Sequence, residues 1–152
     1  MTEFAEVAGF PVALDRAYDP ENHLWVSVSE PATVARIGLD ALGVETSGTL
    51  AQLAFVGVGE AIKRGEAFGS LEAAKFVGPL TSPLSGRVTS TNEAVVADPR
   101  LVESDPYGAG WLIELTLSDP SELDGLVRGA EAVPAWFAAE VADYRLKGVL
   151  AE

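Results

Sequence analysis

The sequence predicts a mostly β fold, a β-sandwich or flattened barrel with a short helix and a longer helix near its C-terminal end. Many short segments alternate apolar and polar residues between turns rich in Gly, Pro and Ser. Helical spacing of apolar residues occurs only near the end of the chain. A chain of 152 residues can bury a core of its own. We therefore expect one domain over residues 1–152, with an N-terminal arm at 1–20 and a C-terminal helix at 132–147.

The first part of the chain is predicted to form an arm followed by antiparallel strands. Residues 1–20 mix Ala, Val and Gly with two prolines and have no long period, which indicates an arm packed on the domain. Alternating apolar residues predict strands at 24–28 and 34–39. A short helical turn is expected at 40–44, and another strand at 50–56.

A hairpin with a lysine at its turn is expected next. The chain runs outward over 67–74 and returns over 77–81, with Lys75 between the two strands. Pro79 has no N–H for a β-ladder, so its strand should lie at a solvent-facing edge or pair irregularly. An exposed lysine is ordinarily a solubilising charge. A primary amine held at a tip is, however, unhindered and suited to acylation.

The rest of the chain predicts two more strands and then helices. Alternation indicates strands at 87–91 and 111–117. Asp119 is a suitable N-cap, and Pro120 suits the first position of a short helix. An apolar stripe at helical spacing then predicts a helix that covers an open sheet edge or face; its members are Val133, Phe137, Val141 and Tyr144.

Charge and hydropathy exclude several classes of partner. Ten basic residues against 23 acidic ones give a net charge of −13, which repels phosphate backbones and anionic headgroups. We expect no nucleic-acid or membrane partner. No apolar stretch is long enough to span a membrane, and the first residues lack the basic region of a signal peptide, so we expect a cytoplasmic protein. The acidity fits either docking on basic rims of enzymes or a saline environment.

Few residues could support catalysis. The chain has no cysteine, which excludes thiolate catalysis and thiolate metal sites, and one histidine, which excludes a multi-histidine site. His23 is expected to pack or to form hydrogen bonds, and Trp25, Trp111 and Trp136 are expected in the core. The sequence therefore predicts a protein that is not an enzyme.

Three separated motifs carry a family resemblance. They are the hairpin run from Gly69 to Val88, the run D-P-Y-G-A-G-W-L-I from Asp105 to Ile113, and E-N-H-L-W-V from Glu21 to Val26. In this order they resemble the glycine cleavage system H protein family, the lipoyl carriers. The resemblance spans about Tyr18 to Glu140 and implies the hybrid-motif β fold of lipoyl carriers.

The resemblance implies lipoate in amide linkage to Lys75. Glu72, three residues before the lysine, and Gly86, eleven after it, match positions that the attaching enzymes of the family read. Those partners are a lipoate ligase or lipoyl-assembly enzymes. A biotin carrier is the chemical rival, but biotinyl lysines are typically flanked by methionines, whereas Ala74 and Phe76 flank Lys75. An exposed Phe76 would also suit contact with a partner.

The sequence leaves three hypotheses for the pathway that this carrier serves. The sequence from Lys75 to Leu80 is similar to that of lipoate-binding proteins of the heterodisulfide-reductase-like system of sulfur-oxidising bacteria. It has Phe76 where the H-protein family commonly has alanine, and Pro79 in place of aspartate. The hairpin text thus favours a carrier of sulfur-bound intermediates, whose partners are that complex and sulfur-transfer proteins. The alternative is a genuine glycine cleavage H protein, served by glycine decarboxylase, aminomethyltransferase and dihydrolipoamide dehydrogenase. The third is a non-lipoylated binding or regulatory relative.

Overall fold

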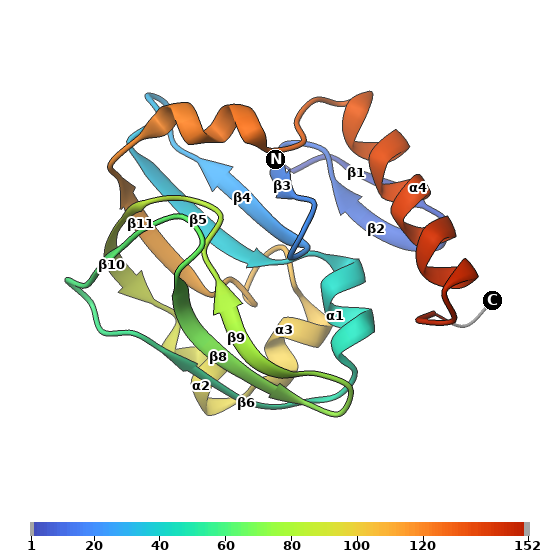
Figure 1. Ribbon diagram of the computed structural model, residues 1–152, viewed down its shortest axis with the longest axis horizontal. Coiled ribbons are helices and arrows are strands. Elements are labelled where there is room, and N and C mark those ends of the chain that lie inside the picture. Colours follow the sequence, from blue (N-terminus) through green and yellow to red (C-terminus); the bar gives the residue numbers. More distant parts are fainter. Residues whose placement is uncertain (1, 151–152) are drawn as a thin grey trace.

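Three antiparallel sheets with helices at their edges make up residues 2–150, the part of the chain that this computed structural model describes (Figure 1). In chain order the elements are β1 (Phe4–Val7), β2 (Phe10–Ala13), β3 (Ala17–Asp19), β4 (Leu24–Val28), β5 (Val34–Leu39), α1 (Ala41–Ser47), β6 (Leu50–Phe55), β7 (Ala61–Ile62), β8 (Ala67–Ala73), β9 (Val77–Thr81), β10 (Gly86–Thr91), α2 (Glu93–Ala97), α3 (Arg100–Ser104), β11 (Ile113–Leu117), the 3-10 helix η1 (Pro120–Gly125) and α4 (Ala132–Leu146).

Two of the sheets form a sandwich. The six-stranded sheet has the order β3-β4-β5-β11-β10-β7, and the three-stranded sheet has the order β6-β8-β9. Their inward side chains form one continuous apolar cluster, in which Ile37 and Leu115 of the larger sheet join Leu53, Phe68 and Leu71 of the smaller one. Burying each such side chain contributes about 1.5–3 kcal/mol. Both sheets stay open, so the sandwich form of the prediction holds and the flattened barrel does not.

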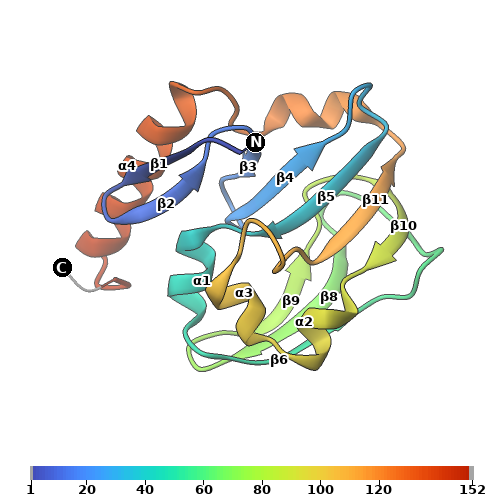
Figure 2. The ribbon, with the colours of Figure 1, turned by 180° about the vertical axis from the view of Figure 1, so that it is seen from behind.

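A second apolar cluster fastens α4 to the rest of the protein. Val133, Phe137 and Val141 are buried at helical spacing, and they pack with Trp25 and Tyr18 and with the β1–β2 hairpin. Figure 2 shows α4 lying along that hairpin, beside the two larger sheets.

Within residues 2–150, no helix combines the length and the apolar character that a membrane span requires.

Most of the predicted elements are present at their predicted places. The strands at 24–28, 34–39 and 77–81 have the predicted bounds, and β9 with Pro79 is an edge strand as expected. Asp119 caps η1, because its carboxylate accepts a hydrogen bond from the N–H of Ser121 at 3.1 Å.

Other expectations need correction. The expected arm contains three strands, two of which pair as a hairpin. The turn expected at 40–44 is a helix that extends to Ser47, and α2 and α3 were not predicted. Trp25 is buried, but Trp111 and Trp136 are only half-buried, because each lies at the rim of the second cluster.

Candidate functional site

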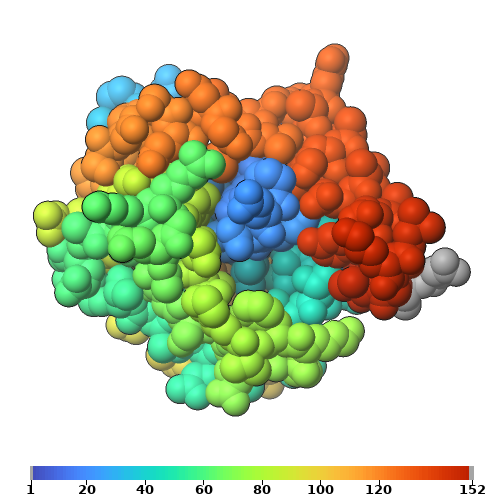
Figure 3. Space-filling view, in the orientation of Figure 1, coloured from blue at the N-terminus to red at the C-terminus, as the bar shows by residue number. Residues whose placement is uncertain are grey.

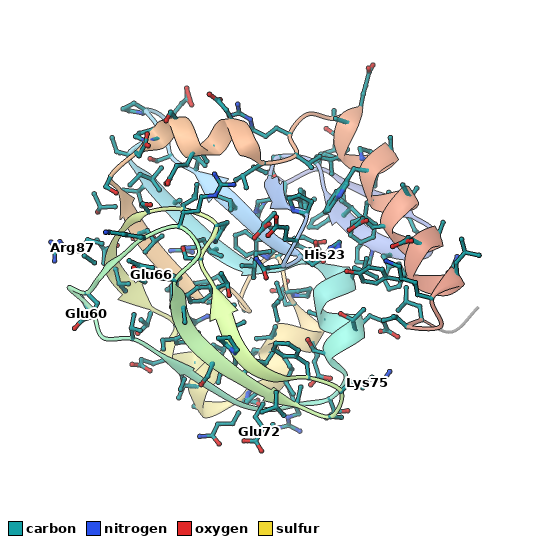
Figure 4. The ribbon with its side chains drawn as sticks, in the orientation of Figure 1. His23, Glu60, Glu66, Glu72, Lys75 and Arg87 are labelled. Carbon is teal, nitrogen blue, oxygen red and sulfur yellow. The ribbon has the colours of Figure 1, made fainter. Side chains whose placement is uncertain are left out.

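Lys75 lies at the tip of the β8–β9 hairpin. The register pairs Glu72 with Val77, and the N–H of Ala73 donates to the carbonyl of Phe76 at 2.8 Å, which closes the turn. The Lys75 side chain is exposed and points into solvent, away from the hairpin (Figure 4). Structure and sequence therefore agree on the presentation of this lysine.

The tip backbone is fixed even though the side chain is free. The N–H of Ala74 donates to the carbonyl of Thr49, and the N–H of Lys75 donates to the carbonyl of Ser47, each at 2.9 Å. Ser47 is the last residue of α1, whose first turn is capped by the Asp40 carboxylate through the N–H of Gly43 at 2.8 Å. These bonds hold the attachment point in one place on a short, capped helix.

Gly48 makes room for the aliphatic stem of Lys75. Its backbone has φ +76° and ψ −161°, a conformation that only glycine adopts readily. A β-carbon at this position would lie 3.2 Å from Cγ of Lys75 and 3.3 Å from Cβ of Ala74. The absence of a side chain at residue 48 thus sets the direction in which the lysine leaves the fold.

The amine of Lys75 is available for acylation. None of the ion pairs found among residues 2–150 includes it. An amine without a carboxylate partner and without packed neighbours can reach the active site of an attaching enzyme. Together with the cradle at Gly48, this arrangement fits a lysine that holds a long covalent arm such as lipoate.

The two other predicted recognition residues lie in different places. Glu72 is exposed on the outward face of β8 and points into solvent near the tip (Figure 4). Gly86 is buried at the start of β10, in the other sheet, where a β-carbon would collide with the carbonyl oxygen of Thr116. Close packing therefore requires glycine at residue 86. Its recognition by attaching enzymes stays a prediction, as does that of Glu72.

Phe76 is exposed next to the lysine, as expected, but its ring folds back over the hairpin. The ring carbon Cζ lies 3.1 Å from the place that a β-carbon of Gly78 would take. Phe76 keeps 41% of its surface exposed, and the neighbouring Val77 keeps 74%. The tip therefore offers an apolar surface immediately beside the modifiable amine.

A groove opens on the other side of Phe76. In Figure 3 the surface is hollowed between the hairpin, α1 and the segment before β4, with α4 beyond it. Much of its wall is apolar, with side chains from four strands and the ring of Tyr144 from α4; among them are Leu24, Leu39, Leu71 and Leu80. Polar groups of His23, Thr46 and Ser47 also line it. The sequence did not predict this groove, because its residues meet only through the tertiary fold.

His23 is buried and hydrogen-bonded, as predicted. Its ring nitrogens lie 2.8 Å from a carboxylate oxygen of Asp40 and 2.9 Å from one of Glu140. Within residues 2–150, no cluster of three or more His, Cys, Asp or Glu residues has the arrangement of a metal site.

A β fold that presents an unpaired lysine on an anchored hairpin tip fits the class of covalent carrier proteins. The family model for the glycine cleavage H-protein matches residues 16–136. The glycine cleavage system H protein of Cyanothece sp. is 41% identical over 98 residues, which cover 64% of this chain and 76% of that protein. H protein 2 of Aquifex aeolicus is 34% identical over 129 residues, covering 84% of this chain and 80% of that one.

A solved structure agrees with the sequence comparisons. The crystal structure of a glycine cleavage system H protein from Mycobacterium marinum superposes with a TM-score of 0.66 at 33% identity, over 75% of this chain and 97% of that one. The chain belongs to the glycine cleavage H-protein family, and it is a lipoyl carrier of that family and not an enzyme.

Proposed function

We propose that this protein is a glycine cleavage H protein that carries the aminomethyl group of glycine on a lipoyl group attached to Lys75. The observation that carries the proposal is the presentation of Lys75, whose backbone is bonded to the end of α1 while its amine stays free. The relatives from Cyanothece sp., Carboxydothermus hydrogenoformans and Aquifex aeolicus are named glycine cleavage system H proteins, which supports the glycine cleavage system as the pathway that this carrier serves.

The protein's own residues hold and direct the arm. Lipoate supplies a dithiolane whose sulfur atoms accept and release the carried group. The carbonyls of Ser47 and Thr49 fix the backbone of the tip, and Gly48 leaves room for the aliphatic stem of the lysine. Because the chain has no cysteine, thiols on the arm meet no protein thiol with which to form a mixed disulfide.

The groove beside the tip would give the arm a resting place. Phe76 borders both the attachment point and the groove, and the groove's leucine side chains suit an alkyl chain. The ring nitrogens of His23 and the hydroxyl proton of Thr46 already form hydrogen bonds within the protein, so the groove would hold the arm mainly through its apolar walls. An arm bound there is shielded from water, whereas an arm in solvent is available to a partner.

Two sets of partners follow from this proposal. A lipoate ligase or a lipoyl-assembly pathway would modify Lys75, with Glu72 and Gly86 as the features it reads. Glycine decarboxylase, aminomethyltransferase and dihydrolipoamide dehydrogenase would then meet the loaded or spent arm. Phe76 and Val77 are the apolar contacts that the tip offers to such enzymes.

The sequence of the hairpin favours the sulfur carrier over the glycine cleavage H protein, and the function proposed here is the second of these. The run from Phe76 to Pro79 favoured a carrier of sulfur-bound intermediates, and the exposed ring of Phe76 is the observation that still favours it. The relatives reported above are named for glycine cleavage and favour the aminomethyl carrier instead.

Transfer of the aminomethyl group from glycine to the lipoyl arm by glycine decarboxylase tests directly which pathway the carrier serves. Lipoylated protein is incubated with the decarboxylase and glycine, and intact mass is followed. The proposal predicts a mass gain for the aminomethyl group in the wild type and in the Lys63→Arg control, and none in Lys75→Arg. Lipoylated protein that stays unloaded while a known H protein is loaded would favour the sulfur carrier. Failure of lipoylation itself would favour the non-lipoylated relative.

A further inference from the structure

His23 occupies an unusual position in the turn between β3 and β4. It is buried, with φ +53°, a left-handed conformation that is uncommon for a residue other than glycine. Its N–H donates to the carbonyl of Asp19 at 3.0 Å, and its carbonyl accepts from the N–H of Asp40 at 2.9 Å. These bonds fix the backbone of His23, and its imidazole lies between α1 and α4 (Figure 4).

Both ring nitrogens of His23 face carboxylates. Nδ1 lies 2.8 Å from Oδ2 of Asp40, the N-cap of α1, and Nε2 lies 2.9 Å from Oε1 of Glu140 in α4. A neutral imidazole carries one N–H, whereas an imidazolium carries two. Two ionised carboxylates can both accept hydrogen bonds only when the ring is protonated. While both carboxyls are ionised, the hydrogen bonding is therefore complete for the cation and incomplete for the neutral ring.

Among residues 2–150, the other recorded contacts of the imidazole are aromatic and bring no cation to it. Trp136 stacks on the ring with centroids 5.2 Å apart, and Tyr144 meets it edge-on at 5.6 Å. The titratable groups that face the imidazole are thus the carboxyls of Asp40 and Glu140 and the phenol of Tyr144. The carboxylate of Asp19, which precedes the same turn, accepts hydrogen bonds from the N–H of Glu21 and from the side-chain amide of Asn22. On α4, Lys147 pairs with Asp143 and is not directed at the ring.

The electrostatic balance agrees with the geometry. Burial lowers the pKa of His23, but hydrogen bonds and charge interactions with Asp40 and Glu140 more than offset it, so the pKa is raised above its ordinary value of 6.5. Burial raises the pKa of the Asp40 carboxyl above its ordinary value, although the hydrogen bond and the charge of His23 act in the opposite direction.

We propose that His23 is a proton-dependent latch that fastens α4 to α1. The imidazolium bonds Asp40 and Glu140 at once, and so joins the cap of α1 to the middle of α4. Loss of the proton leaves one nitrogen without an N–H, and one carboxylate then faces a lone pair. The second half of α4 loosens, and because His23 and Tyr144 both line the groove, that groove opens.

The sign of the pH dependence follows from the raised pKa. The latch contributes its full stabilisation below the unfolded-state pKa of about 6.5 and loses it as pH rises through the folded-state pKa. α4 should therefore be held most firmly in mildly acidic solution and less firmly in alkaline solution, where its buried apolar stripe still holds it.

The wild-type protein allows a direct test, because His23 is its one histidine. NMR of the unlipoylated protein follows the imidazole C–H resonances against pH, and hydrogen exchange gives protection factors for amides of α4, corrected for base catalysis of exchange. The proposal predicts a His23 pKa above 6.5 and a loss of α4 protection over the same pH range. A pKa at or below 6.5, or protection that stays constant while His23 titrates, would overturn it.

Two variants of α4 sharpen the test. In Glu140→Gln the amide can donate to Nε2 while Nδ1–H donates to Asp40, so the neutral ring is satisfied; the His23 pKa should fall and α4 protection should become independent of pH. Glu131→Gln removes the same charge at the exposed start of α4, with no hydrogen bond to His23, and should behave as the wild type. If both variants shift the pKa equally, or neither does, the latch is refuted. The test needs no lipoate, so it is separate from the proposed carrier function.

Discussion

At the scale of single residues, Gly48 controls how the modifiable lysine leaves the fold. Its conformation is one that glycine alone adopts readily, and a β-carbon would press on the Lys75 stem. We predict that Gly48→Ala lowers the free energy of unfolding by about 1–3 kcal/mol. Urea unfolding gives the stability, and the initial rate of lipoylation, which should also fall, shows the effect on the tip.

Gly57→Ala is the matched control for this prediction. A β-carbon at residue 57 would meet nothing within 4 Å, and its φ is not positive. Stability should change by no more than about 0.5 kcal/mol. Equal effects of the two substitutions would show that the cradle at Gly48 is unimportant.

Phe76 provides a second prediction at this scale. If its exposed ring contacts a client enzyme, Phe76→Ala should raise the KM of lipoylated protein for glycine decarboxylase about fivefold, which corresponds to about 1 kcal/mol. Steady-state kinetics measure the change. Val58→Ala removes another exposed apolar side chain, in the β6–β7 loop, whose Glu60 lies far from Lys75 in Figure 4, and should leave KM unchanged. An unchanged KM in Phe76→Ala would remove the docking role.

Residue-level prediction from sequence succeeded where local pattern was sufficient. Lys75 could be placed at a turn because alternating segments flank it, and Asp119 could be identified as a cap from its neighbours. The packing roles of Gly48 and Gly86 and the hydrogen bond of Glu140 could not be predicted, since each depends on a contact with a distant part of the chain.

At the scale of elements, α4 is held mainly by its buried stripe. Phe137 is fully buried and packs with Phe10 and Trp136. Phe137→Ala should lower the free energy of unfolding by about 3–5 kcal/mol. Urea unfolding measures it, with Leu146→Ala as the control, because Leu146 is 87% exposed on the same helix. A small loss for Phe137→Ala would show that α4 contributes little to the fold.

Prediction of elements depended on their length. The six residues of β5 and the fifteen of α4 are long enough for a period to be visible, and both were predicted. α2 and α3 have five residues each, so neither completes two helical turns of pattern. β1 and β2 pair only with each other, and their four-residue segments do not alternate clearly.

At the scale of the whole molecule, the net charge of −13 should make stability depend on salt. Added salt shortens the screening length from about 10 Å at 0.1 M to about 3 Å at 1 M, which weakens repulsion among surface carboxylates. We predict that the melting temperature rises with NaCl over this range. A melting temperature that falls would mean that the surface ion pairs outweigh the repulsion.

Attachment of lipoate at Lys75 is the claim on which the rest of the account depends, and intact mass after treatment with a lipoate ligase and lipoate tests it most directly. The account predicts a gain of one lipoyl group in the wild type and in Lys63→Arg, mapped to Lys75 by peptide analysis, and no gain in Lys75→Arg. A wild-type mass that stays unchanged while a known H protein is modified, or a lipoyl group on Lys63 or Lys147, would contradict it.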